Sequence, residues 1–377
     1  MAEKHLIFTA MRAAMEGTTV EPPVTEEEMI ALYKLAKRHD VAHLLAAALQ
    51  GKMLQVDMTA TLHRQYMTAI FRTEQLRAEL EVLTAALEAA KIPFIPLKGS
   101  VLRDRYPDSW MRTSCDIDVL LHKEDLPRAV QLLCEQHGYV QTASSAYDVS
   151  LQAVGGVHVE LHFDLAASGT TPSCSAVLAE VFAHAVPASE GSCCYVLSDE
   201  MFYFYHVAHM AKHFIKGGCG LRPFLDLTVL EVKDTAALEK RNALLQRGGL
   251  MTFATTVRAL AAYWFADGEI PPYATEVEAF ILSGGSYGTR KNTLANSQAQ
   301  QGSKLKFLCS RIFLRYDTIK YIYPVLQRHR WLTPFYEVKR WFTLLFKKSA
   351  RRHFKRTVTA DNAEVAARAA FLKNIGL

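Results

Sequence analysis

The sequence predicts an α+β protein in which a small mixed β-sheet is flanked by amino-terminal helices and a larger helical carboxy-terminal region. Three observations predict this class. Before residue 91 and after residue 198, apolar residues recur at helical spacing. Between these regions, short apolar segments alternate with polar residues, as strands do. A segment of helical spacing separates two of the predicted strands, an order that suits a small α/β core.

Composition narrows the class of protein. The chain has 377 residues, 50% hydrophobic and 21% charged, which excludes disordered, collagen-like and coiled-coil chains. No apolar run reaches the roughly 18 residues of a membrane span, and no signal-peptide pattern stands at the amino terminus. The seven cysteines are scattered, without a CxxC pair, which argues against a disulfide framework or a structural zinc site. We therefore expect a cytoplasmic protein.

Residues 1–90 are predicted to form an amino-terminal helical region. Thr25 precedes three glutamates and a segment of helical spacing, which is the pattern of a helix N-cap with acids in the first turn. A longer helix is predicted from about Met58 to Ala90, because Ala, Leu, Glu and Arg dominate it.

Residues 91–197 are predicted to form the sheet-containing core. Pro93 ends the preceding helix, and the apolar FIPL that follows runs into Gly99-Ser100. Two further segments alternate as strands, and one segment between them has helical spacing and closes at a glycine. In order, these segments are the strand 116–122, the helix 126–139 and the strand 155–165. Residues 166–199 lack a regular pattern and predict a linker or a variable insertion.

Two helical parts follow. Ser198-Asp199-Glu200 is a good helix start for a predicted domain over residues 198–282. A second helix there is expected over 221–232, with Pro223 in its first turn. Residues 283–377 are predicted to be a basic, aromatic-rich helical segment entered through a polar loop over 283–304.

Positive charge is concentrated near the carboxy terminus. Residues 302–356 hold fifteen Lys and Arg residues and two acids, a charge of +13, while the rest of the chain carries −8. We call residues 304–356 the basic segment. Three interpretations remain open: helices that pack their aromatics inward, an amphipathic helix on an anionic membrane, and a groove for nucleic acid. The first is the expectation.

The sharpest chemical signal is Asp116-Ile117-Asp118. In a strand, residues two apart point to the same face, so the two carboxylates lie side by side. Two carboxylates at so short a distance repel each other unless a cation lies between them. Mg²⁺ prefers one or two carboxylates together with substrate phosphates. Two acids at this spacing are also common on exposed strands, so the pair is weak evidence by itself.

Neighbouring residues strengthen the signal. Gly99 allows close approach of the backbone to a ligand, and Ser100 supplies a donor to an anion. Glu160 lies within an apolar strand, where an acid is costly unless it is paired or metal-bound. Three acids on two strands beside a Gly-Ser turn indicate phosphoryl-transfer chemistry with two metal ions.

This order of motifs resembles the polymerase-β-like nucleotidyltransferase superfamily. More narrowly, PLKGSVLRDRYPDSWMRTSCDIDVLL, GGVHVELHFDL and LRPFLDL, spread over residues 96–227, resemble an uncharacterised nucleotidyltransferase family of bacteria. The resemblance implies that the mixed sheet is a nucleotidyltransferase core. It also implies Mg²⁺-dependent transfer of a nucleotide.

The resemblance also implies roles for individual residues. Gly99 and Ser100 would hold the triphosphate, and Asp116, Asp118 and Glu160 would bind two Mg²⁺ ions. Glu160 would also help to deprotonate the acceptor. Ser100 and Asp116 are sixteen residues apart, a longer spacing than in the minimal members of the superfamily, so the loop between them must differ.

Several cations and histidines are further candidates for nucleotide binding. Lys98 and Arg112 lie beside the motifs and could neutralise phosphate charge. His162 shares a strand face with Glu160 and could contact a phosphate or orient that acid. Arg222 and Asp226 are four apart on a helix, where they can pair with each other, and a contact to the nucleotide or to the catalytic strands is the alternative.

One helix face carries His206, His209 and His213, for which packing or a nucleotide-facing role is favoured over metal binding. Lys212, on the same helix, is a weaker candidate.

The predicted activity is transfer of an NMP from an NTP, with ATP as the first candidate donor, to a hydroxyl of a small-molecule, carbohydrate or peptide acceptor, with release of pyrophosphate. The basic segment favours one alternative, transfer to a tRNA end or a protein side chain. A non-catalytic nucleotide-binding scaffold is the second alternative. The expected location is cytoplasmic, either free or peripheral at a membrane.

Overall fold

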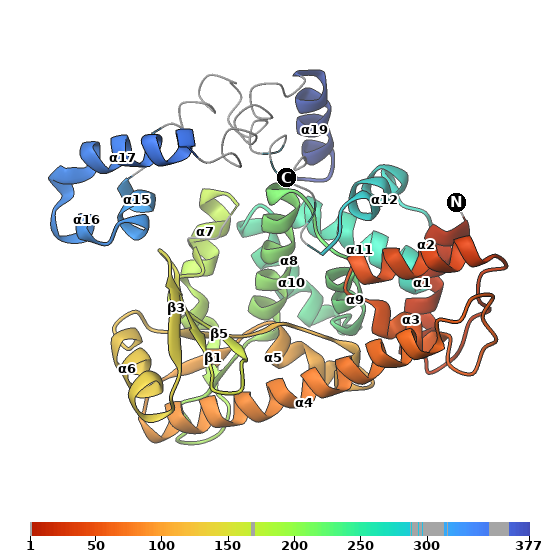
Figure 1. Ribbon diagram of the computed structural model, residues 1–377, viewed down its shortest axis with the longest axis horizontal. Helices are drawn as coiled ribbons and strands as arrows, with labels where there is room; N and C mark the ends of the chain where they lie inside the picture. The colour runs from red at the N-terminus through yellow and green to blue at the C-terminus, as the bar shows by residue number, and fades with distance from the viewer. Residues whose placement is uncertain are drawn as a thin grey trace.

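The structure is a computed structural model that describes residues 2–166, 170–286, 288, 293, 296, 313–314, 316–346 and 362–377. It has the predicted α+β architecture, with a small mixed sheet among many helices (Figure 1). Most of the predicted loop over 283–304 and part of the basic segment lie outside the described residues.

The amino-terminal region is helical, as predicted. Its helices are α1 (Ala2–Met15), α2 (Glu26–Arg38), α3 (Ala42–Ala48) and α4 (Thr59–Ala89). Thr25 caps α2 as expected, because its hydroxyl accepts from the Glu28 amide while the Glu28 side chain accepts from the Thr25 amide.

The main sheet has five strands in the order β1-β2-β5-β4-β3. The apolar FIPL forms β1 (Phe94–Pro96), and the two predicted strands are confirmed as β2 (Asp116–Leu121) and β5 (His158–His162). β2 runs parallel to β5, and every other pairing in this sheet is antiparallel. Between β1 and β2 lie α5 (Gly99–Leu102) and two 3-10 turns (Arg103–Arg105 and Ser109–Met111), and β2 is followed by the predicted helix α6 (Leu126–Gln136).

Sequence patterning missed the hairpin of β3 (Val140–Ser144) and β4 (Asp148–Gln152). β3 is an edge strand whose five residues are all exposed, so it needs no apolar alternation.

The interpretation of 166–199 as irregular was also wrong for the residues described there. They form α7 (Pro172–Ala179), a 3-10 turn (Val181–His184) and a hairpin of β6 (Ala185–Pro187) and β7 (Tyr195–Leu197). Contacts distant in sequence stabilise these short elements. The Glu88 carboxylate at the end of α4, for example, accepts from the amides of Cys193 and Cys194.

The carboxy-terminal helices pack with the amino-terminal ones around one hydrophobic core. Phe8 of α1, for example, stacks on Trp264 with ring centroids 4.7 Å apart. These helices are α8 (Asp199–Lys216), α9 (Arg222–Val229), α10 (Thr235–Arg247), α11 (Met251–Phe265) and α12 (Ala274–Ser283). Further along the chain lie α15 (Tyr316–Ile322), α16 (Val325–Arg328), a 3-10 turn (Arg330–Leu332), α17 (Thr333–Phe346) and α19 (Asn362–Asn374). Among the described helices, none is long and apolar enough to cross a membrane.

The two faces of the sheet have different roles. On one face, Ile117, Val119 and Val159 join a second core with α4 and α6. Because side chains alternate along a strand, Asp116, Asp118 and Leu120 point to the opposite face. Leu120 joins the first core, which also contains Tyr205 of α8. The sheet thus lies between α4 and α8 (Figure 1), with the acids on the α8 side.

Candidate active site

Asp118 is the centre of the candidate site. It lies on β2, only 4% exposed, and its Oδ1 accepts from Lys98 Nζ at 3.0 Å and from His162 Nε2 at 2.7 Å. Burial alone would raise the pKa of Asp118, but the Lys98 ammonium and His162 together hold it well below its usual value. Asp118 is therefore a carboxylate at any pH near neutral.

Glu160 lies directly opposite Asp118 on the neighbouring parallel strand β5. His162 contacts both acids, because its Nε2 is also 3.4 Å from Glu160 Oε2. The ligand atoms of Asp118, Glu160 and His162 all lie within 4.8 Å of one another. The hydrogen bond from His162 lowers the pKa of Glu160, although burial opposes this. The structure thus brings together two of the three predicted acids, with His162 joining them.

Asp116 lies on the same face of β2, one strand repeat before Asp118. It does not belong to the compact group formed by Asp118, Glu160 and His162. Burial raises the pKa of Asp116, and the negative charges of Asp118 and Glu160 raise it further. Asp116 therefore interacts electrostatically with Asp118 and Glu160 but lies at the edge of the group that they form with His162.

Lys98 is held in an uncommon backbone conformation with φ 41°. Holding a non-glycine residue in this conformation costs about 1–3 kcal/mol, which the surrounding contacts must offset. Here the Leu97 amide donates to the Asp118 carbonyl at 2.9 Å, and the Lys98 ammonium binds the Asp118 carboxylate. The pKa of Lys98 is raised, because Asp118 outweighs the opposing effect of burial.

Gly99 and Ser100 begin α5 immediately after Lys98. A Cβ on Gly99 would lie 2.9 Å from Arg112 Nη1 and 3.1 Å from Ser114 Oγ, so no larger residue fits without movement. Ser100 is 8% exposed, and its hydroxyl has no hydrogen-bond partner among the described residues. A buried hydroxyl without a partner is unfavourable unless a ligand or water completes it.

Arg112 and Asp226 form a buried ion pair with each other. Arg112 Nε and Nη2 donate to the two oxygens of Asp226 at 2.7 and 3.0 Å, and the Tyr106 hydroxyl donates to the same carboxylate at 2.7 Å. Burial would raise the pKa of Asp226, but Arg112 holds it below its usual value. The pair fastens the loop that leads into β2 to helix α9.

Arg222 and Asp226 can pair at their spacing, but they bind different partners. Arg222 donates to the Thr113 carbonyl at 2.5 Å and lies 3.3 Å from Asp40 Oδ2. The i, i+4 spacing permits that pair, but Arg112 offers Asp226 a two-pronged contact inside the core. Within the LRPFLDL motif of α9, Arg222 and Asp226 thus both bind the loop before Asp116.

Helix α8 covers the acids and brings Tyr205 and Lys212 near them, with His209 near Lys98. The Tyr205 phenol lies near Lys98 and Asp118, and burial raises its pKa. Lys212 Nζ lies 5.3 Å from the ring centroid of Tyr147, and burial lowers the pKa of Lys212 to about 8. The spacing 205, 209, 212 is one helix face, but sequence analysis did not select Tyr205 or Tyr147.

The three histidines of α8 do not form a metal-binding group among the described residues. His206 Nε2 lies 3.1 Å from the Pro223 carbonyl, whereas His209 and His213 contact each other, with their Nε2 atoms 3.2 Å apart. Burial lowers the pKa of His206, His209 and His213, so each is neutral near pH 7. The favoured packing role accounts for His206.

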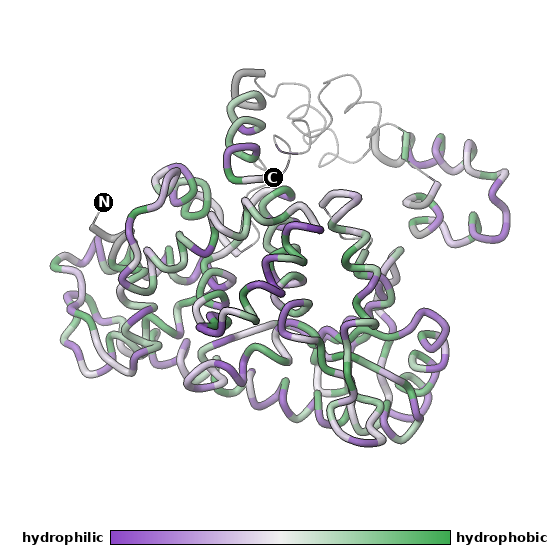
Figure 2. The backbone as a smooth tube through the Cα atoms, turned by 180° about the vertical axis from the view of Figure 1, so that it is seen from behind, coloured by the Kyte–Doolittle hydropathy of each residue, from purple (hydrophilic) through white to green (hydrophobic). Residues whose placement is uncertain are grey.

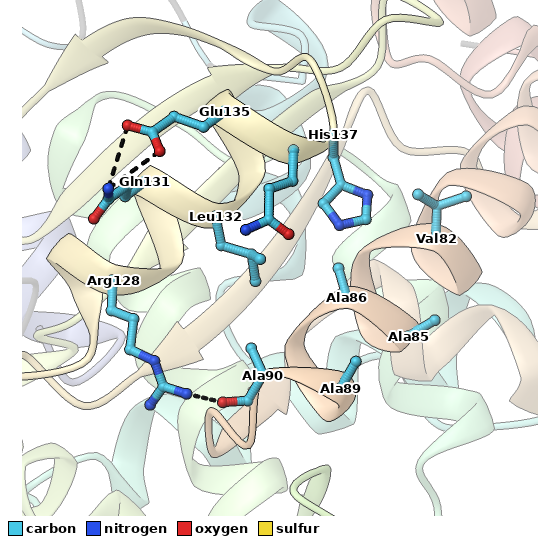
Figure 3. Close-up of a pocket in the computed structure, with 11 residues that line it drawn as sticks. Val82, Ala85, Ala86, Ala89, Ala90, Arg128, Gln131, Leu132, Glu135 and His137 are labelled. Carbon is cyan, nitrogen blue, oxygen red and sulfur yellow. Dashed lines mark hydrogen bonds between the residues drawn. The ribbon is translucent and has the colours of Figure 1, made fainter.

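A hollow between α4 and α6 does not coincide with the acids (Figure 3). Ala86, Ala89 and Leu132 line it, and Arg128 donates to the Ala90 carbonyl at its edge. Because α4 and α6 cover the opposite face of the sheet, this hollow is separate from the candidate active site.

The donor set fits a divalent cation. Asp118, Glu160 and His162 bring their ligand atoms within 4.8 Å of one another, and Asp116 adds a carboxylate at the edge of this group; carboxylate oxygens are ligands that Mg²⁺ accepts. The mutual repulsion of the three carboxylates, which contributes to the raised pKa of Asp116, is the interaction that a cation would relieve. Lys98 and His162 donate to Asp118 and would orient it as a ligand.

Residues 25–266 match the model of a family described as uncharacterised nucleotidyltransferase, and the chain belongs to that family. The match confirms the resemblance of the motifs to an uncharacterised nucleotidyltransferase family, and the chain is a nucleotidyltransferase. No curated protein sequence matches it.

Proposed function

We propose that the chain catalyses Mg²⁺-dependent transfer of an NMP from an NTP, with ATP as the first candidate donor. The acceptor is a hydroxyl of a small molecule, a carbohydrate or a peptide, and pyrophosphate is released. One observation carries the proposal: the buried Asp118 faces the partly exposed Glu160 across parallel strands, and both acids contact His162. Two carboxylates this close repel each other, and a bound cation would relieve that repulsion.

Magnesium ions held by Asp116, Asp118 and Glu160 would neutralise the triphosphate and acidify the acceptor hydroxyl. Lys98 and His162 fix the orientation of Asp118, since both bind the same carboxylate oxygen. The unpartnered hydroxyl of Ser100 supports its role as a donor to a phosphate oxygen. Arg112, Asp226 and Arg222 position the loop before Asp116, and in this proposal they act on the nucleotide through that loop.

Glu160 is the proposed base. Its side chain is 28% exposed, against 4% for Asp118, and its lowered pKa keeps it ionised near neutral pH. The acceptor oxygen attacks the α-phosphorus, the bond from that phosphorus to pyrophosphate breaks, and the acceptor proton passes to Glu160 and then to water. A base that reaches solvent can release this proton after each turnover.

Binding of the donor tests the first step. Thermal unfolding of the purified chain is measured with ATP, GTP, CTP and UTP, each with and without Mg²⁺, because a ligand of the folded state raises its stability. We expect a Mg²⁺-dependent shift that disappears in Asp118→Asn and persists in Glu135→Gln, an exposed acid on α6. An equal shift in wild type and Asp118→Asn would contradict the site.

The class of acceptor is tested by pyrophosphate release. Small-molecule hydroxyls, sugars, peptides, tRNA and whole protein are supplied in turn with the donor that gave the thermal shift. The proposal expects a soluble small acceptor, a sugar or a peptide to stimulate release. Stimulation by tRNA or protein alone would replace it with the alternative that the basic segment favoured.

A further inference from the structure

Helix α17 and the turn before it expose a row of large apolar side chains. Trp331, Phe335, Val338 and Phe342 are 70%, 67%, 43% and 58% exposed. Phe335, Val338 and Phe342, three and four residues apart, lie on one face of α17, and Trp331 lies in the 3-10 turn directly before that helix. A contiguous exposed apolar patch marks an interaction surface, whereas single exposed apolar residues do not. We call these four residues the aromatic stripe.

The opposite side of α17 is fixed in the fold. Glu337 is 7% exposed, and its carboxylate accepts from the Leu314 amide at 2.7 Å and from Arg340 at 2.9 Å. Glu337 lies about half a helix turn from the middle of the stripe, at 100° per residue. The stripe therefore faces outward because the other side of α17 already has partners.

Cations accompany the stripe. Residues 316–346 contain five Lys and Arg residues and two acids, a net charge of +3. Arg328, Arg330 and Lys339 are exposed, and Lys339 lies next to Val338 at the border of the stripe. An apolar helix face with aromatic residues and bordering cations is the pattern of a helix that lies in the surface of a membrane.

We propose that α17 and the turn before it dock on the surface of an anionic phospholipid bilayer. The aromatic stripe would enter the region between headgroups and acyl chains, and the bordering cations would contact lipid phosphates. Docking in the plane of the surface is consistent with the described helices, none of which could span a bilayer.

Two other partners fit the surface less well. Nucleic acid binding needs a cationic groove with stacking rings, whereas this stripe lies on a single helix and the turn before it and includes the aliphatic Val338. A second copy of the chain would bring two regions of net charge +3 together, which is electrostatically unfavourable. An anionic bilayer satisfies the stripe and the cations at once.

The docking surface is distinct from the candidate active site. In both views α17 lies away from the strands β2 and β5 that carry the acids (Figures 1 and 2), whereas α16 approaches the edge strand β3, where Pro324 and Gln327 line a hollow together with Gln141 and Ser144. The inference does not depend on the proposed reaction, and its test uses no nucleotide.

Vesicle co-sedimentation of the full chain tests the proposal. We expect the chain to bind phosphatidylcholine vesicles containing 30% phosphatidylglycerol, and to bind pure phosphatidylcholine more weakly. Phe335→Ser combined with Phe342→Ser should lower the binding constant at least about tenfold, because two aromatic side chains no longer enter the bilayer. The matched control is Met53→Ser with Phe71→Ser, which also removes two exposed apolar side chains, 90% and 68% exposed.

A second readout needs no folding control. Brominated lipids should quench the tryptophan fluorescence of the wild-type chain, and the strongest component of this quenching should be absent in Trp331→Phe. Several results would overturn the proposal: no binding to anionic vesicles, equal loss in the Met53/Phe71 control, or quenching unchanged in Trp331→Phe. Two further assays test the other partners: binding of an RNA oligonucleotide, and dimer formation measured by light scattering. If the Phe335/Phe342 variant loses one of these activities while its vesicle binding persists, the stripe belongs to that partner instead.

Discussion

The buried pair of Arg112 and Asp226 gives the sharpest prediction about stability. Asp226→Asn keeps the shape of the side chain but leaves the Arg112 guanidinium buried without an anion. Both side chains are almost fully enclosed, 7% and 1% exposed. Breaking a buried pair by removing one partner costs about 3–5 kcal/mol, and we expect a loss in that range in the free energy of unfolding.

Urea denaturation measures this loss, and Glu231→Gln is the matched control. Glu231 pairs with Arg258 at the surface, with the two side chains 51% and 34% exposed, and such pairs contribute at most about 1 kcal/mol. A double variant, Arg112→Met with Asp226→Leu, should regain part of the loss, since no buried charge then lacks a partner. A loss below about 1 kcal/mol in Asp226→Asn would refute the reasoning.

The same pair predicts a dependence on pH. The pKa of Asp226 is lower in the folded than in the unfolded chain, so the unfolded state binds the proton more readily. The contribution of Asp226 to stability is complete above its unfolded pKa, about 4. It falls as the pH drops toward the folded pKa. In Asp226→Asn, the free energy of unfolding should fall less than in wild type as the pH is lowered, because the titrating carboxylate is gone.

Three further predictions concern the site. Gly99→Ala places a Cβ 2.9 Å from Arg112 Nη1 and should cost about 1–3 kcal/mol of stability, measured by urea denaturation; an unchanged midpoint would contradict the tight contact. Lys98→Met removes the ammonium from Asp118, and we expect at least about a hundredfold loss of nucleotide transfer with the fold retained in circular dichroism. The pKa of Lys212 is about 8 in the folded chain and 10.5 in the unfolded chain. Between these two pH values the unfolded state binds more protons than the folded state, so the free energy of unfolding should rise with pH over that range. Thermal unfolding should show this rise in wild type, and a rise of equal size in Lys212→Met would exclude Lys212 as its source.

Local patterning predicted the elements whose signals lie within a few residues. Thr25 and Glu28 form a cap from adjacent positions, and the acids of β2 and β5 are recognisable by alternation in an apolar strand. The fully exposed β3 carries no apolar signal, because one side of it faces water and it closes the edge of the sheet.

The partners of the site residues could not be predicted in the same way. Arg112 and Asp226 are 114 residues apart in the sequence, and no local rule chooses that contact over the nearby Arg222. Tyr205 approaches the acids only because α8 packs on that face of the sheet. The sequence motifs indicated which acids to select, whereas the surroundings that shift their pKa values required the fold.

The fate of labelled phosphate tests the central claim most directly. The chain is incubated with Mg²⁺, an acceptor pool and ATP labelled either at the α-phosphorus or at the γ-phosphorus. Nucleotidyl transfer predicts that the α label enters the acceptor, that the γ label leaves as pyrophosphate, and that Asp118→Asn abolishes both. Incorporation of the γ label into the acceptor, or incorporation of the α label that is unchanged in Asp118→Asn, would contradict the account.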